Sequence, residues 1–375
     1  GRPLTAWMLE LYAPDPQVRK RAEAVLRSVD DRAIPTLTWA LRQRDPMLRR
    51  PLLAMESRLP RRLSSALHRV IRPYDAVLMR RAGARGLNLV TPPPLAALPA
   101  LTEALRDDDH QVWSNVAAVL ANLGEPGAKA LIQALRRDDD DLRLHALAVM
   151  DLRRMNTNQA VPLLLDLLAR GRGRIPIAAG EVLQTLGPAA LPHLFGLLAT
   201  GDSEARFLTS QTLISLGSRD FAALTALLDA APQQTARVRH EIALALSQMQ
   251  PFTRRVAWGL ARLLSDPDHE VRLAAAGGLR RVLAAAGPAI PTLIEALCHS
   301  QPETRQLAAA VLADLGPAAK AAIPTLTQRL EDPDEAVRRQ VGEALRLITS
   351  NQPLGPSATG VVKPPTDNLG SGQPP

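Results

Sequence analysis

An arginine recurs along this chain at a nearly constant interval, and this periodicity constrains the fold more than any other feature. The arginine follows a small residue and precedes a leucine by seven positions. A fixed period of this length is typical of proteins in which each repeat is one supersecondary unit that packs against its neighbours. The five most regular arginines are each 33 residues apart, and they are Arg206, Arg239, Arg272, Arg305 and Arg338.

A second motif, Pro-x-Leu within an apolar run, recurs 14 residues before the arginine position. Asp and Pro residues lie between the two motifs, where a helix N-cap and a first helical turn prefer them. Gly then follows many of the second apolar segments, and Gly readily ends a helix. We therefore predict that each repeat is a helix A, a short turn and a helix B. The predicted stops are Gly124, Gly187, Gly217 and Gly316.

We call the arginine position the repeat slot. Slots at positions 19, 49, 80, 113, 143, 176, 206, 239, 272, 305 and 338 define about eleven helical hairpins of 30–33 residues. Two slots depart from the pattern, because Trp113 and Pro176 replace the arginine. Proline lacks an N–H group, so we expect the hairpin of Pro176 to be looser than the others.

The stretch from Asp268 to Ala275 reads D-H-E-V-R-L-A-A, and Asp334 to Arg338 reads D-E-A-V-R. This pattern resembles HEAT repeats, in particular the short bacterial form called PBS-lyase HEAT-like. The resemblance implies an all-α fold, a right-handed α-α superhelix whose B helices line a concave groove. The opening segment Gly1–Trp7 is also similar to the start of the soluble part of bacterial HEAT-repeat proteins that follow an N-terminal membrane anchor.

The composition divides the chain further. We expect a HEAT-repeat solenoid over 1–349, with a basic part at 1–90 and regular repeats over 91–349. Residues 350–375 are rich in Pro, Gly and Ser and have few large apolar side chains, which predicts a flexible tail.

Positive charge is concentrated in the first quarter of the chain. Residues 1–90 hold 18 Lys and Arg against 8 Asp and Glu, whereas the remainder holds 27 against 29. Like charges aligned on successive helices raise the local potential and attract anionic partners. The candidate basic surface consists of Arg19, Lys20, Arg27, Arg49, Arg50, Arg80, Arg81 and Arg85. Its alternatives are a solvated face, or a basic collar against anionic lipid.

The slot arginines themselves have a structural interpretation that we prefer to contact with nucleic acid. An arginine once per repeat, beside a turn aspartate, can pair with carboxylates of the same or the next hairpin and form a ladder. The acidic runs 107–109 and 138–141 lack the Gly and terminal Glu of an EF-hand loop. We therefore interpret them as helix caps rather than calcium ligands.

Sequence motifs for catalysis, metals or cofactors are not evident. The seven His residues form no His-x-x-x-His pair, Cys298 is the single cysteine, and nucleotide-binding glycine motifs are missing. We therefore expect no enzyme activity, no metal site and no cofactor. One enzymatic alternative is similarity to HEAT-like alkylpurine DNA glycosylases, in which Trp113 and Asp109 would serve the reaction.

The middle B helices differ from the basic first quarter. After the slot they carry neutral and apolar residues, which predicts a central groove for a partner. Its candidate residues are Trp113, Leu144, Phe207, Gln211 and Leu244.

These features predict a non-catalytic scaffold that grips a partner protein, as an accessory subunit of a larger complex. The alternative is a nucleic-acid or anionic-surface binder that acts through residues 1–90, with a lipid surface ahead of nucleic acid among such partners. The compartment follows from what precedes Gly1: periplasmic or membrane-anchored with a signal or anchor, and cytoplasmic without one.

Overall fold

The computed structural model describes residues 2–29, 31–44, 76–91, 94–281 and 287–350. The contacts divide the chain into two compact units, unit 1 (Gly1–Val238) and unit 2 (Arg239–Pro375). Over the described residues the regular structure is helical throughout, with α-helices and short 3₁₀ turns. The prediction of an all-α fold of helical hairpins is confirmed.

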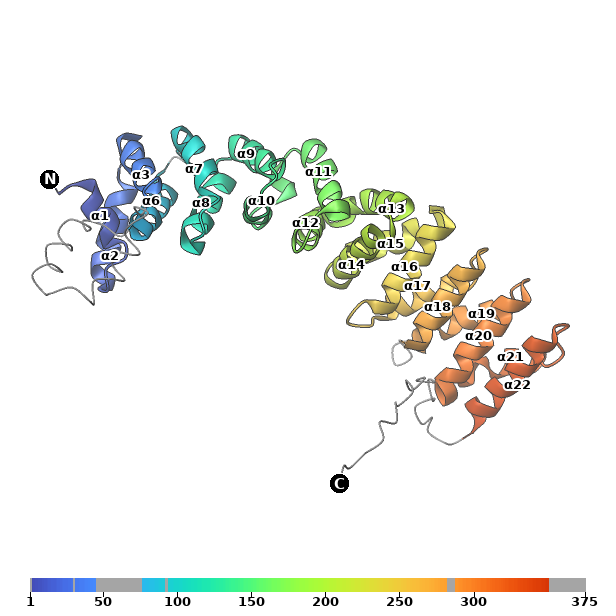
Figure 1. Ribbon diagram of the computed structural model, residues 1–375. Helices are drawn as coiled ribbons and strands as arrows, with labels where there is room; N and C mark the ends of the chain where they lie inside the picture. The colour runs from blue at the N-terminus through green and yellow to red at the C-terminus, as the bar shows by residue number, and fades with distance from the viewer. Residues whose placement is uncertain (1, 30, 45–75, 92–93, 282–286, 351–375) are drawn as a thin grey trace, which may run out of the picture. The chain divides into compact units, whose positions relative to one another are not determined.

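In the described residues of unit 1, A and B helices alternate along the chain (Figure 1), with residues 45–75 lying outside the description between α3 and α6. The A helices are α1 (Leu4–Glu10), α3 (Ile34–Leu41), α7 (Leu98–Ala104), α9 (Glu125–Leu135), α11 (Thr157–Arg170), α13 (Leu191–Thr200) and α15 (Phe221–Ala230). The B helices are α2 (Pro16–Arg27), α6 (Ala76–Leu89), α8 (His110–Asn122), α10 (Asp140–Leu147), α12 (Ile175–Gln184) and α14 (Ser203–Arg219).

Helix α16 (Ala236–Gln248) contains the residue boundary between the two units. The other helices of unit 2 alternate in the same way. Its A helices are α17 (Arg254–Leu263), α19 (Ile290–Ala296) and α21 (Ile323–Arg329). Its B helices are α18 (His269–Arg281), α20 (Pro302–Leu315) and α22 (Glu335–Thr349). Every slot that falls on described residues lies in a B helix, as the period predicts.

Aspartates begin the B helices as predicted. The Asp109 carboxylate accepts hydrogen bonds from the N–H groups of Gln111 and Val112, and Asp139 accepts one from Leu142. Such caps satisfy N–H groups that have no partner within the helix and stabilise it by about 0.5–2 kcal/mol each. The capping interpretation of both acidic runs is therefore confirmed.

The ends of the B helices agree with the sequence at three of the four predicted glycines. Gly124, Gly187 and Gly316 have positive φ angles of 65°, 59° and 54°, which a residue without a Cβ atom adopts most easily. The prediction for Gly217 is wrong, because α14 continues through it to Arg219. Pro176 lies buried in the first turn of α12, where the missing N–H group costs no hydrogen bond.

The core lies between the helices of successive hairpins. The leucine seven residues after the slot is the repeated core residue, and its side chain is completely buried at Leu26, Leu213, Leu246, Leu279 and Leu312. Burial of one leucine side chain stabilises the fold by roughly 1.5–3 kcal/mol. The same position at the two unusual slots is also fully buried, at Leu120 and Leu183.

One apolar stretch of unit 2, Pro302–Arg329, has the length and composition of a membrane span. It comprises α20, the 3₁₀ segment Gly316–Ala322 and α21. The backbone leaves the helical conformation at Ala319, and half of the most apolar window is buried within the protein. Part of the apolar character of this stretch therefore comes from side chains that pack against α22.

Candidate functional site

Several slot arginines donate hydrogen bonds to backbone carbonyls in the turn that precedes their own B helix. Arg272 donates through Nη1 to the carbonyl oxygens of Asp266 and Pro267, at 2.9 and 3.0 Å. Arg305 makes the same pair of bonds to the residues six and five positions before it. Arg19 and Arg338 repeat this pattern. The bonds satisfy carbonyls that the tight turn leaves without helical partners, which explains why arginine recurs at this position.

Three slot arginines also pair with an aspartate 27 residues later, in the next hairpin. Arg239 binds both carboxylate oxygens of Asp266, at 2.7 and 2.8 Å. Arg305 binds Asp332 in the same bidentate way, at 2.7 and 2.8 Å. Arg80 reaches Asp107 at 2.6 Å. The predicted ladder of ion pairs is therefore confirmed at these slots. These guanidinium groups are engaged within the protein, because only 7–17% of each side chain is exposed.

The ion pairs between arginine and aspartate make the free energy of unfolding depend on pH in the acid range. The hydrogen bond from Arg305 lowers the pKa of Asp332 below its ordinary value, and that from Arg81 lowers the pKa of Asp109. A depressed folded-state pKa contributes stability that is present above the unfolded-state pKa of about 3.9 and is lost as the pH falls through the folded-state value.

We therefore expect the free energy of unfolding, measured in urea, to fall steadily below about pH 4. The Asp332→Asn variant is expected to show a shallower decline, because residue 332 no longer titrates. A decline in the variant that is as steep as in the unaltered chain would contradict this role for Asp332.

The basic surface predicted for residues 1–90 is largely neutralised where it is described. Arg81 pairs with Asp109 at 2.6 Å, Arg85 pairs with Glu23, and Arg80 is part of the ladder. The Arg19 guanidinium bonds to backbone carbonyls. Lys20 and Arg27 are exposed on α2. Arg49 and Arg50 lie outside the described residues.

Asp109, the acid of the glycosylase alternative, is engaged in contacts within the protein. The Asp109 carboxylate caps α8 and accepts three hydrogen bonds from Arg81, which occupy both of its oxygens. The lowered pKa that follows weakens it as a proton acceptor. Asp109 is therefore a structural residue at the junction of α6 and α8.

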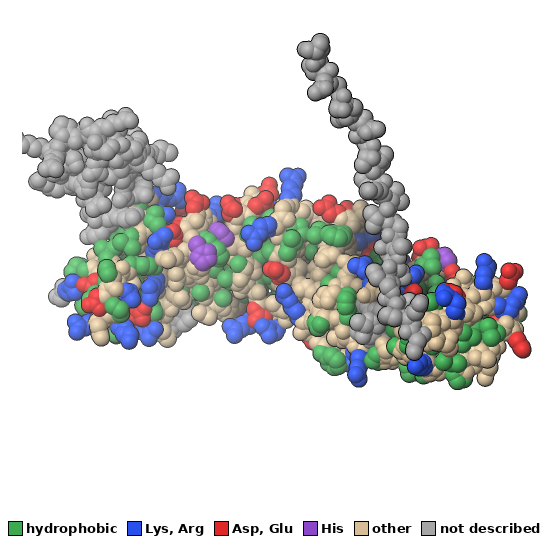
Figure 2. All heavy atoms as spheres, turned by 90° about the horizontal axis from the view of Figure 1, so that it is seen from below, with side chains coloured by type: hydrophobic (Ala, Val, Ile, Leu, Met, Phe, Trp, Pro, Cys, Tyr) green, Lys and Arg blue, Asp and Glu red, His purple; other side chains and the backbone are tan. Residues whose placement is uncertain are grey.

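A groove of about 620 Å³ lies across the B helices α8, α10 and α12 of unit 1. Two of the predicted residues, Trp113 and Leu144, line it. We call this hollow the B-helix groove. These helices lie below their A helices in Figure 1, and the view from below in Figure 2 shows histidine side chains beside hydrophobic ones over this part of the chain. Its other lining residues include Asp141, His145, Met150, Arg174, Ile177 and Glu181.

An aromatic cluster forms one end of the B-helix groove. The rings of Trp113 and His145 stack with centroids 4.2 Å apart and an interplanar angle of 9°. His110 meets the Trp113 ring edge-on at 4.9 Å. The Nδ1 atom of His145 lies 2.7 Å from the Leu105 carbonyl oxygen, so Nδ1 carries a proton and donates it. Packing between aromatic rings fixes this end of the groove.

An apolar ridge runs from the groove along three successive B helices. Leu144, Ile177 and Phe207 each occupy the position after the slot. Ile177 is 59% exposed and Phe207 is 61% exposed. We call these three residues the apolar ridge. Gln211, one turn after Phe207, is also exposed.

Ile177 was absent from the sequence prediction, although position 176 was assigned as a slot. The rule that the residue after the slot faces the groove would have included it. In unit 2, predicted Leu244 is 36% exposed on α16, and Leu273 occupies the position after its slot and is 41% exposed.

Exposed carboxylates flank the ridge, one from each B helix. Asp141, Glu181 and Glu204 lie three or four residues from a ridge residue, which places them on the same helix faces. Each is exposed, and over the described part of the chain they form no ion pair. Arg174, three residues before Ile177, is a cation that lines the groove beside them.

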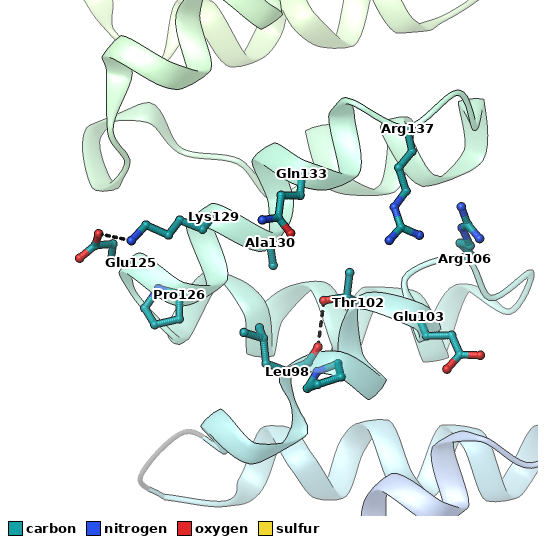
Figure 3. A pocket seen from close by; sticks show the side chains of 11 residues that line it. Leu98, Thr102, Glu103, Arg106, Glu125, Pro126, Lys129, Ala130, Gln133 and Arg137 are labelled. Carbon is teal, nitrogen blue, oxygen red and sulfur yellow. Dashed lines mark hydrogen bonds and ion pairs between the residues drawn. The ribbon is translucent and has the colours of Figure 1, made fainter.

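A second hollow of about 660 Å³ lies between the A helices α7 and α9. Figure 3 shows Thr102, Gln133, Arg106 and Arg137 around it, with mixed charges at its rim. Lys129 pairs with Glu125 at 2.7 Å, and Arg106 pairs with Asp139 at 2.9 Å. These pairs leave a polar, partly neutralised surface. Over the described residues no cluster of His, Cys, Asp and Glu is arranged to hold a metal ion.

The regular hairpins of unit 2 match a known family model. The model describes HEAT repeats, and it covers residues 256–346. Residues 256–346 of this chain match HEAT repeats. Within the matched segment lie the slots Arg272, Arg305 and Arg338, whose arginines clamp the turns. The sequence resemblance to HEAT repeats is thereby confirmed.

Comparison with solved structures finds helical-repeat proteins of low sequence identity. Kap95p, solved with RanGDP, shares 14% identity over 90% of this chain and 49% of its own, with a TM-score of 0.37. Kap121p shares 13% over 92% of this chain and 40% of its own, with a TM-score of 0.36. Human deoxyhypusine hydroxylase shares 19% over 68% and 96%, with a TM-score of 0.29. The chain thus spans about half the length of Kap95p. No curated protein sequence matches it.

Proposed function

We propose that this protein is a non-catalytic scaffold that binds a partner protein through the B-helix groove and the apolar ridge. The carrying observation is the exposure of Ile177 and Phe207 on adjacent B helices, beside a groove that Leu144 also lines. Large apolar side chains gathered on one rimmed surface are a characteristic of partner-binding sites, since their burial on association is favourable.

The HEAT architecture suits this role because each hairpin adds one B helix to a continuous surface. The aromatic cluster supplies a rigid anchor, and aromatic residues contribute much of the energy at protein interfaces. An accessory role within a larger assembly is part of the same proposal, and the exposed apolar surface supports it because such a surface is suited to burial against a partner.

Substitutions on the ridge test the proposal. We expect Ile177→Ser to weaken partner capture about tenfold, because it removes roughly one buried apolar side chain from the interface. A photo-reactive amino acid placed at Phe207 cross-links the bound protein in extracts of the source cells and so identifies it. The amount of cross-linked partner recovered with and without Ile177→Ser measures the loss of binding.

Leu95→Ser is the matched control, since Leu95 is 58% exposed and precedes A helix α7. Equal loss in both variants, or no loss at Ile177→Ser, would refute the groove as the binding site. Capture abolished by Lys20→Glu with Arg27→Glu, and unaffected by Ile177→Ser, would instead assign binding to the exposed basic residues of α2 and to an anionic partner.

A further inference from the structure

We infer that the occupant of the B-helix groove is an amphipathic α-helix of the partner, with apolar residues at seven-residue spacing and basic residues beside its apolar stripe. The inference rests on the proposed function and specifies the chemistry of the partner segment. Its two grounds are the spacing of the apolar ridge and the charge of the residues that flank it.

The spacing of the ridge follows from the repeat. Leu144, Ile177 and Phe207 occupy the same position in successive B helices, and these helices pack directly, α10 against α12 and α12 against α14. Packed helices lie about 8–10 Å apart, so successive ridge residues are separated by about that distance. Seven residues of an α-helix rise about 10.5 Å. A helix laid across the B helices therefore meets one ridge residue with every heptad.

An extended strand fits this ridge less well. Its side chains alternate between faces and repeat on one face every two residues, at about 6.7 Å. One such step is about 1–3 Å shorter than the spacing between ridge residues and two steps are about 3–5 Å longer, whereas one helical heptad exceeds that spacing by about 0.5–2.5 Å. An amphipathic helix offers an apolar stripe that coincides with the ridge along its length, with the polar face turned to solvent.

Charge complementarity selects among amphipathic helices. Asp141, Glu181 and Glu204 contribute one exposed carboxylate from each B helix, and Arg174 offsets one of them. Lysine or arginine side chains beside the apolar stripe of a bound helix reach these carboxylates. A helix with glutamates at the same positions would meet like charges, which disfavours binding.

The same carboxylates argue against two other occupants. A second copy of this chain, placed ridge against ridge, would bring Asp141, Glu181 and Glu204 of each copy toward those of the other. Nucleic acid would place phosphates against them. Both arrangements are electrostatically unfavourable. An amphipathic helix with basic flanks would instead contact the apolar ridge and pair with the carboxylates beside it.

Two synthetic 21-residue helical peptides test the inference. Both carry leucine at the first and fourth positions of each heptad, and they differ only in having lysine or glutamate at the flanking positions. Fluorescence anisotropy with the full chain is expected to show about tenfold tighter binding of the lysine peptide, since several exposed ion pairs of modest strength add up.

Variants locate the peptide on the surface. Glu181→Lys with Glu204→Lys is expected to remove the preference for the lysine peptide, and Ile177→Ser is expected to weaken its binding about tenfold. Glu331→Lys is the matched control, because Glu331 is exposed in unit 2 and lies outside this surface. Equal affinity for the two peptides, preference for the glutamate peptide, or binding of neither overturns the inference.

Failure of this inference is distinguishable from failure of the proposed function. If cross-linking at Phe207 captures a partner protein through an acidic or extended segment, the scaffold function stands and the basic helix is rejected. If light scattering shows a dimer of the chain that Ile177→Ser dissociates, the occupant is a second copy and the inference is overturned.

Discussion

Replacement of Arg305 by methionine is expected to lower the free energy of unfolding by about 3–5 kcal/mol. Asp332 has no exposed side-chain surface, and Arg305 binds both of its oxygens. Methionine leaves this carboxylate charged, buried and short of its main partner. The substitution also removes the two bonds that hold the carbonyls of His299 and Ser300 in the preceding turn. Urea unfolding followed by circular dichroism measures the change.

Two further variants separate the buried pair from arginine substitution in general. Arg346→Met removes an exposed pair with Glu343 and is expected to cost less than about 1 kcal/mol. Arg305→Met combined with Asp332→Leu is expected to recover much of the loss, because it removes the uncompensated charge as well. If Arg305→Met were no more destabilising than Arg346→Met, the ladder would not support the stack.

The hairpin register was predictable from the sequence because each repeat places equivalent residues in equivalent surroundings. The slot arginine, the capping aspartate and the leucine seven positions later recur for separate physical reasons, and their joint period fixes helix A and helix B. The exception at Gly217 is instructive. Gly217 stays within α14, which ends at Arg219, and Asp220 then supplies the cap for α15.

The basic surface was harder to predict because its partners lie in other hairpins. In the net charge of residues 1–90, Arg80 and Arg81 belong to the excess of positive charges over negative ones. The structure brings carboxylates against them from the turn before α8, 27 and 28 residues away. The relation of a slot arginine to an aspartate 27 residues later is visible in the sequence, and it identifies Arg80 as structural. The contact of Arg85 with Glu23 depends on packing of α2 against α6 and has no local signal.

The groove was partly predictable for the opposite reason. Residues that follow the slot face outward from the B helices whatever their type, so Leu144 and Phe207 could be assigned from register alone. The position of His145 could not, because its stacking on Trp113 and its bond to the Leu105 carbonyl depend on how α8, α10 and the end of α7 pack. The ring pair gives the groove a fixed end that the composition does not indicate.

The close approach of α8 and α9 leads to a second large effect, in which Gly127→Ala is expected to destabilise the chain by about 1–3 kcal/mol. A Cβ atom on Gly127 would lie 1.8 Å from the Leu120 carbonyl oxygen and 2.8 Å from its carbon, so the backbone of one helix must move. The displacement would reach Leu120 itself, whose side chain is fully buried between the hairpins.

Gly196→Ala is the matched control and is expected to have the opposite sign. Gly196 lies within α13, and a Cβ atom there would meet no heavy atom within 4 Å. Alanine stabilises an unobstructed helical position by up to about 1 kcal/mol, because it restricts the unfolded chain. Thermal unfolding of the two variants compares the same chemical change with and without the close contact. Equal shifts in both would mean that α8 and α9 accommodate the added Cβ atom without cost, which would contradict this prediction.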